Sequence, residues 1–193
     1  MKLVTWNTQW CRGVDGPVSP ARIIEDARRL ADFDVLCLQE IAVNYPALAG
    51  HPGDQPAELA ALLPGFQLFF GAAVDEWTAD GQRRRFGNLI ATRLPVAQLQ
   101  HHRLPYPADA GVRSMPRMCT ALTVRDPALG VVRVMTTHLE FYSKRQRMAQ
   151  VQGIVALHKE ATAQALAPPE PSTDGSPFQG KAHAVHAILC GDF

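Results

Sequence analysis

Four polar side chains lie where apolar segments of the sequence end. Asn7 follows Leu-Val-Thr-Trp, Glu40 follows Val-Leu-Cys-Leu-Gln, His138 follows Val-Met-Thr-Thr and Asp192 follows Ile-Leu-Cys-Gly. Each alone has an ordinary structural explanation, as a turn former, a solvated acid or a hydrogen-bonded histidine. Because strand ends on one rim of a sheet converge in space, the four together form a candidate site. They offer oxygen ligands for a hard cation and one imidazole, and they lack the cluster of soft ligands that zinc prefers.

The strands that must position these residues are predicted from short apolar runs bounded by turn residues. They cover residues 2–6, 34–39, 66–74, 86–92, 117–124, 131–137 and 185–190. Asp80-Gly81 predicts a hairpin between the third and fourth strands, and Asp126-Pro127 predicts a turn between the fifth and sixth. The strand over 185–190 is expected to be buried, with neighbours on both sides.

Three helices are predicted. The first begins at Pro20 after the N-cap Ser19, a short second one covers 56–63, and a long third one begins at the capping box Ser143-Lys-Arg-Gln146. Apolar spacing predicts which face of each long helix is buried. The expected faces are Ile23, Ala27 and Leu30 for the first helix, and Met148, Val151, Ile154/Val155, His158 and Ala161/Ala165 for the third.

Loops rich in Pro, Gly and Asn separate these elements. Residues 43–56 and 101–116 are expected to be loops, and residues 167–181 a flexible loop. Trp77 and Arg83-Arg84-Arg85 flank the hairpin turn, where the favoured interpretation is a solvated hairpin tip and the alternative is a grip on a phosphate backbone or a lipid headgroup.

Composition limits the class of protein. The chain has 193 residues, 47% hydrophobic and 19% charged, with a formal net charge of +1. A core is therefore expected, and both wholesale disorder and a polybasic nucleic-acid binder are excluded. Four widely spaced cysteines without a C-x-x-C pair indicate a reducing, cytoplasmic location. No apolar run is long enough to span a membrane, and no obligate protein partner is indicated.

Five segments in a fixed order carry a family resemblance across residues 3–193. They are Leu-Val-Thr-Trp-Asn7, Asp-Val-Leu-Cys-Leu-Gln-Glu40, Phe-Gly-Asn88-Leu-Ile-Ala-Thr-Arg-Leu-Pro, Thr-Thr-His138-Leu-Glu and Ile-Leu-Cys-Gly-Asp192-Phe. The chain resembles the endonuclease/exonuclease/phosphatase superfamily, whose fold is that of pancreatic deoxyribonuclease. The resemblance implies an α/β fold, a four-layer α/β/β/α sandwich of two mostly antiparallel sheets, with a divalent metal at one rim.

The resemblance also implies roles for the four residues. Glu40 matches the principal metal-binding glutamate and Asn7 the asparagine beside it, with Mg²⁺ or Mn²⁺ as the cofactor. His138 matches the histidine that contacts the scissile phosphate, and Asp192 matches the aspartate that orients or deprotonates the attacking water. These roles fit the chemistry, because phosphate-ester cleavage needs an activated water and stabilisation of charge on the phosphoryl oxygens.

Other residues are candidates for binding the substrate phosphate. Arg117 is one, with the role of a charge at a strand edge as an equal alternative, and Asn88 in the third of the five segments is another. Arg147 and Gln150 resemble the Arg-x-x-Gln that follows the Thr-His-Leu segment in many family members. Lys144 and Arg145 beside them place positive charge at a helix N-terminus, which predicts a nearby anion, a carboxylate or the substrate.

One part of the family pattern has no counterpart in this sequence. The asparagine that follows Gly-Asp-Phe and the later Ser-Asp-His motif are both missing, and no histidine follows Asp192. We therefore expect residues 1–193 to form a single domain that is truncated at the C-terminus, lacks its last strands, is marginally stable and cannot complete catalysis alone.

The function expected from the resemblance is that of a divalent-metal-dependent phosphoesterase. It would hydrolyse a phosphodiester or phosphomonoester by attack of a metal-activated water, on nucleic acid, a phospholipid headgroup or a small phosphate ester. The alternative is a non-catalytic or inactive fragment of the same fold that serves binding only.

Overall fold

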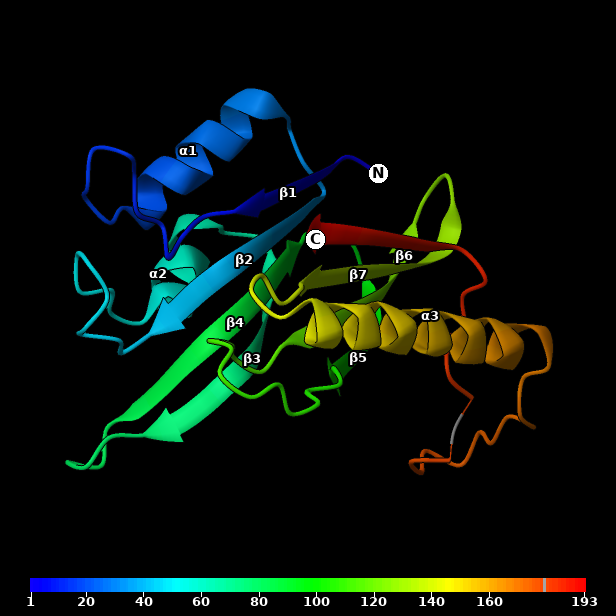
Figure 1. Ribbon diagram of the computed structural model, residues 1–193. Coiled ribbons are helices and arrows are strands. Elements are labelled where there is room, and N and C mark those ends of the chain that lie inside the picture. The colour runs from blue at the N-terminus through cyan, green and yellow to red at the C-terminus, as the bar shows by residue number, and fades with distance from the viewer. Residues whose placement is uncertain (179) are drawn as a thin grey trace.

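The fold consists of two four-stranded sheets and three helices in a computed structural model, which describes residues 1–178 and 180–193 (Figure 1). In spatial order the first sheet is β1 (Leu3–Asn7), β2 (Val35–Val43), β4 (Arg83–Thr92) and β3 (Gln67–Trp77). The second sheet is β5 (Val96–Arg103), β6 (Met118–Asp126), β7 (Gly130–His138) and β8 (Ala187–Asp192). The helices are α1 (Pro20–Leu30), α2 (Gln55–Leu62) and α3 (Lys144–Leu166).

Each sheet contains one parallel strand pair, and this feature creates the rim. β1 is parallel to β2 and β7 is parallel to β8, whereas the other neighbours are antiparallel. In the parallel pairs Asn7 lies opposite Gln39, and His138 lies opposite Asp192. Both sheets therefore bring two strand ends to the same edge of the sandwich.

Three apolar clusters separate four layers, as the resemblance predicted. The first lies between α1, α2 and the first sheet, and its centre includes Ile24, Leu38 and Leu59. The second lies between the sheets and includes Ile90 and Leu122. The third lies between the second sheet and α3 and includes Met135, Leu139 and Ile154. The predicted fold class, an α/β sandwich of two mostly antiparallel sheets, is confirmed (Figure 1).

The helix starts follow the local sequence. The Ser19 hydroxyl accepts a hydrogen bond from the Arg22 amide at 3.2 Å, and the Ser143 hydroxyl accepts one from the Gln146 amide at 3.1 Å. Both predicted N-caps are confirmed. The reciprocal half of the capping box is not formed, because the Gln146 side chain donates to the Pro107 carbonyl oxygen instead. None of the helices in the described part of the chain is long and apolar enough to cross a bilayer.

The predicted buried faces of the helices are only partly right. In α1, Ile23 and Ala27 are buried, but Leu30 is exposed. In α3, Ile154 is buried as predicted, but the predicted Met148, Val151, Val155 and His158 are exposed. Gln146 and Gln150 are buried instead. Two glutamines occupy buried positions because they bind backbone groups of the loops beside them, a reason that apolar spacing does not reveal.

Two boundaries and the burial of one strand also differ from prediction. Residues 96–103 form β5, so the loop expected over 101–116 begins after Arg103. β2 extends to Val43 through an irregularity at Glu40. β8 is less buried than its apolar sequence suggested, since Leu189 is exposed and Cys190 alone is buried. The loop expected over 167–181 contains residue 179, which lies outside the described residues; the described residues between α3 and β8 form no helix or strand.

The burial of α3 predicts different costs for two apolar residues on the helix. Ile154→Ala should lower the free energy of unfolding by roughly 2–4 kcal/mol, because Ile154 packs in the third cluster. Met148→Ala should change it by less than about 0.5 kcal/mol, because that side chain is exposed. Urea unfolding followed by circular dichroism measures both, and equal costs would contradict the observed orientation of the helix.

Candidate active site

The four strand-end residues meet at one rim, from both sheets. The Asn7 amide nitrogen donates to Glu40 Oε1 at 3.1 Å and to Asp192 Oδ2 at 2.7 Å. His138 stands between the same two carboxylates, with Nδ1 3.6 Å from Glu40 Oε1 and Nε2 3.6 Å from Asp192 Oδ2. The structure therefore assembles all four predicted residues into one cluster.

A break in strand β2 aims Glu40 at the rim. The pairing of β2 with β4 is irregular between Leu38 and Ile41, and Glu40 has a φ of 60°, in the left-handed region. The Glu40 carbonyl oxygen accepts a hydrogen bond from the Trp10 amide at 2.7 Å, which ties the bulge to the loop after β1. A non-glycine residue held in this region costs about 1–3 kcal/mol, and such residues cluster at functional sites.

The carboxylate of Glu40 is partly desolvated and lacks a directly bonded cation. Burial raises its pKa above the ordinary value, and the hydrogen bond from Asn7 and the charge of Arg117 oppose this change. A carboxylate in this state gains more from a bound cation than an exposed one does. The donor set is dominated by oxygen, which fits Mg²⁺ or Mn²⁺ better than a soft metal.

The amide of Asn7 has an orientation that matters for this fit. Its nitrogen points at both carboxylates, and its oxygen accepts a hydrogen bond from the Gln9 amide at 3.1 Å. To serve as an oxygen ligand on the Glu40 side, the amide must turn over and exchange its two ends. Within the described residues, no three His, Cys, Asp or Glu side chains surround a common metal position.

His138 is neutral in this arrangement. Burial lowers its pKa to about 4, and the charge of Arg117 adds to the effect, although Asp192 and Glu140 oppose it. The Nδ1 atom is buried and has no hydrogen-bond partner among the described residues. At 3.6 Å, neither carboxylate is close enough for a normal hydrogen bond. The ring is therefore free to donate one hydrogen bond to a group that enters between the two acids.

Glu140 is a site residue that the sequence reasoning missed. Its carboxylate is fully buried and accepts hydrogen bonds from the Arg117 side chain and the Met115 amide, each at 3.2 Å, and from the Tyr142 amide at 3.0 Å. These contacts lower its pKa against the opposing effect of burial. Its position two residues after His138 was visible in the sequence. Nothing in the sequence, however, paired it with Arg117.

The pairing with Glu140 shapes the role of Arg117. Glu140 binds the Nε atom of Arg117, and the structure records no hydrogen bond from the two terminal nitrogens to any described residue. Arg117 lines a small cavity together with Glu40, Asn88 and His138. Asn88 is also buried there, and its amide nitrogen donates to the Met118 carbonyl oxygen at 3.3 Å. Both predicted phosphate-binding residues thus lie beside the four-residue cluster.

The two α3 residues that resemble the family's Arg-x-x-Gln lie close to the rim. Arg147 donates to the carbonyl oxygens of Glu140 and Phe141, and the Gln150 side chain accepts from the Glu140 amide at 2.9 Å, so both residues hold the segment after His138. Arg147 also borders a hollow of about 270 Å³ beside His138 and Asp192.

The basic hairpin residues do not reach the rim. Arg83 pairs with Asp75 and lies over Trp77, and Arg84 pairs with Glu76. These contacts favour the interpretation as a solvated hairpin.

Comparison with known proteins identifies the family. A model of the Endonuclease/Exonuclease/phosphatase family matches residues 4–193. The chain belongs to this family. A search of curated proteins finds no match.

Solved structures show the same fold. An endonuclease/exonuclease/phosphatase from Beutenbergia cavernae DSM 12333 is 27% identical with a TM-score of 0.59, covering 92% of this chain and 49% of its own. A family protein from Bacteroides thetaiotaomicron is 17% identical with a TM-score of 0.61, covering 82% and 58%. The human Nocturnin catalytic domain with bound sulfate is 18% identical with a TM-score of 0.56, covering 100% and 63%. This chain thus spans about half to two thirds of the length of these structures.

The lowered pKa of His138 predicts a dependence of stability on pH. Between its ordinary pKa of 6.5 and its folded value of about 4, the unfolded chain takes up a proton that the folded chain does not. The folded state should therefore lose on the order of 3 kcal/mol as the pH falls through this window. The raised pKa of Glu40 acts in the opposite direction, so the comparison must be made between variants.

His138→Gln isolates this effect. Relative to the variant, the wild-type protein should become less stable as the pH is lowered from 7 towards 4, in urea unfolding at each pH. Parallel stability curves for the two proteins would show that His138 is not held neutral.

The buried Glu140–Arg117 pair predicts a second stability effect. Glu140→Gln leaves the buried Arg117 charge without its partner and should cost on the order of 3 kcal/mol. The double variant Arg117→Met/Glu140→Gln should recover part of this loss. Glu76→Gln is the control, since its pair with Arg84 is much more exposed and should be worth less than about 1 kcal/mol. Equal losses in Glu140→Gln and Glu76→Gln would contradict the role of the buried pair.

Proposed function

We propose that this chain provides the metal-binding part of a divalent-metal-dependent phosphoesterase. The proposed reaction is hydrolysis of a phosphodiester or phosphomonoester by water, with nucleic acid, a phospholipid headgroup and small phosphate esters as the substrate classes. The observation that carries the proposal is the convergence of four residues at the rim, where Asn7 and His138 each lie 2.7–3.6 Å from both Glu40 and Asp192. Membership of a family named for nucleases and phosphatases supports it.

Glu40 would hold Mg²⁺ or Mn²⁺, and Asn7 would assist after its amide turns over. When bound, such a cation supplies positive charge for the phosphoryl oxygens and lowers the pKa of a bound water. Asn7 also limits the repulsion between Glu40 and Asp192, since its nitrogen donates to both.

The remaining residues act on the substrate and the water. His138, neutral and without a partner at Nδ1, donates a hydrogen bond to a phosphoryl oxygen. Asp192 is the most exposed of the rim acids, and it orients the attacking water and accepts its proton. Arg117, fixed through Nε by Glu140, offers its terminal nitrogens to a phosphate oxygen.

A reducing location is part of the proposal. Cys11, Cys37, Cys119 and Cys190 are all free and buried. Burial raises the pKa of the Cys11 and Cys119 thiols to about 12, so they are protonated and unreactive at neutral pH. Such cysteines suit the cytoplasm and serve as small apolar core residues.

Removal of the Glu40 charge tests the proposal. Glu40→Gln keeps the shape of the side chain, so its thermal midpoint should stay the same or rise, since a partly desolvated charge is lost. Magnesium affinity, measured by calorimetry on this chain, should fall at least about tenfold. Turnover of a phosphodiester panel, measured on the longest protein that the gene encodes, should fall by orders of magnitude.

Glu25→Gln is the matched control. Glu25 lies on α1, where it pairs with Arg29 on the exposed face, and its loss should leave both readouts unchanged. An unchanged magnesium titration in Glu40→Gln would remove Glu40 from the metal site. A protein that binds magnesium through Glu40 but hydrolyses no phosphate ester would favour a binding role for this fold.

A further inference from the structure

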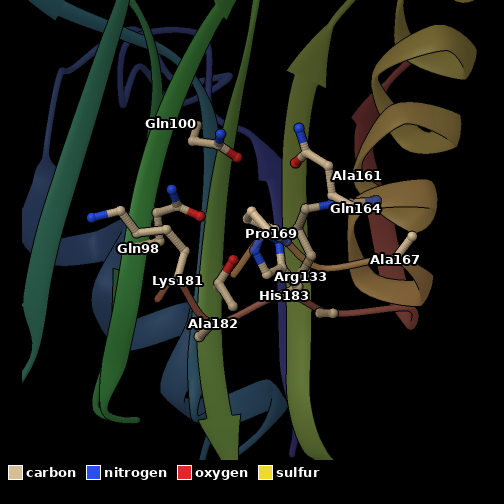
Figure 2. Close-up of a pocket in the computed structure, with 12 residues that line it drawn as sticks. Gln98, Gln100, Arg133, Ala161, Gln164, Ala167, Pro169, Lys181, Ala182 and His183 are labelled. Carbon is tan, nitrogen blue, oxygen red and sulfur yellow. The ribbon is translucent and has the colours of Figure 1, made fainter. Parts of the chain in front are cut away.

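A second polar cavity lies on the far side of the second sheet, away from the rim. It has a volume of about 550 Å³ and lies between strands β5 to β7, the C-terminal half of α3 and the segment before β8. Figure 2 shows the lining side chains between the strands and the helix. None of the rim residues Asn7, Glu40, His138 and Asp192 lines it.

This cavity continues a layer of the second sheet that is otherwise apolar. On the same face of the second sheet, Cys119, Ala121 and Met135 pack against α3 in the third apolar cluster. Thr123 lies two residues beyond Ala121 along β6, and Arg133 lies two residues before Met135 on β7, opposite Thr123. Because side chains two apart on a strand share a face, the apolar layer continues directly into a polar one.

Arg133 is the main charge in this layer, and it has no acidic partner among the described residues. The residue is 4% exposed and lines the cavity. Its only recorded side-chain contact is a 2.9 Å hydrogen bond to His158 Nδ1, and its Nε atom is buried without a partner in the described part of the chain. No described carboxylate oxygen lies within 4.0 Å of its nitrogens. A buried cation without a counter-charge is costly, so an anion that fills this place would be bound favourably.

Other hydrogen-bond donors surround the same space. Lys181 and His183 line it from the segment before β8, and the Nε2 atom of His183 is buried without a partner among the described residues. Gln98 and Gln100 of β5 line it from the sheet, and Gln164 lines it from α3 (Figure 2). Two cations, an imidazole and three amides can supply more donors than the two oxygens of a carboxylate accept.

We propose that this cavity is an anion-binding site for a phosphate group, either inorganic phosphate or the phosphate of a small polar monoester. Arg133 binds two phosphate oxygens through its planar guanidinium, and Lys181 supplies the second positive charge that a dianion requires. The amides and His183 bind the remaining oxygens and any polar substituent. The site is independent of the rim, so its failure leaves the proposed phosphoesterase function untouched.

Site-resolved NMR on the full chain tests this proposal, with inorganic phosphate as the probe. Phosphate should shift the backbone amides of Gln98, Thr123 and Ala182 in a saturable manner. Arg133→Met should weaken this binding at least about tenfold, because hydrogen bonds to a charged group are lost. Any phosphate shifts at Asn7 and His138 should be the same in both proteins, since those residues belong to the other site.

Two further variants keep the test decisive. Lys181 lies on an exposed segment, so Lys181→Gln should fold normally. It should weaken phosphate binding several-fold, and it therefore provides a test even if Arg133→Met does not fold. Arg29→Gln is the control, because this arginine is exposed and paired on α1 and should not alter the titration. Acetate should bind far more weakly than phosphate.

Three outcomes would overturn the proposal. The first is that the chemical-shift changes of the cavity amides do not saturate by about 10 mM phosphate. The second is that neither Arg133→Met nor Lys181→Gln changes the titration. The third is that acetate binds as tightly as phosphate. The first two exclude an anion site at Arg133. The third excludes phosphate as the preferred ligand.

Discussion

The Asn7 amide connects the two sheets at the rim, and the candidate active site depends on this contact. Its nitrogen bonds to Glu40 of the first sheet and to Asp192 of the second, at 3.1 and 2.7 Å. Both acids are placed by parallel strand pairs, β1–β2 and β7–β8, whose ends meet only because the sheets pack face to face. The inter-sheet core therefore places the two acids at one rim, and the Asn7 amide bridges them.

The arrangement of polar groups around this contact follows from burial. Glu40, with a raised pKa, and His138, with a lowered one, are both partly desolvated, so each is sensitive to a charged group that enters between them. Behind them, Glu140 compensates the buried Arg117 and holds the segment that follows β7. At the other end of the same sheet Arg133 has no such acid among the described residues, and this contrast is the basis of the proposed anion site.

Much of the frame was predictable because its signals are local. Ser19 and Ser143 mark the starts of helices because each accepts a hydrogen bond from the amide three residues later. The polar residues at the ends of four strands, Asn7, Glu40, His138 and Asp192, lie on one rim. What could not be predicted depends on contacts distant in sequence. The buried face of α3 is set by Gln146 and Gln150, which bind backbone groups of the neighbouring loops. On β5, the residues that face inward include the polar Gln98 and Gln100, which line a cavity. The pairing of Glu140 with Arg117 joins residues that are 23 positions apart.

The central proposal is that a divalent cation binds through Glu40 at the rim where the four strand ends meet. Substitution of paramagnetic Mn²⁺ during NMR of the uniformly labelled chain tests it directly, since broadening falls steeply with distance from the ion. The account predicts that the amides of Asn7, Glu40, His138 and Asp192 broaden first at substoichiometric Mn²⁺, while those of the hairpin tip around Asp80 and of Lys181 stay sharp. Early broadening at the hairpin tip or at surface acids, with the rim unaffected, would contradict it.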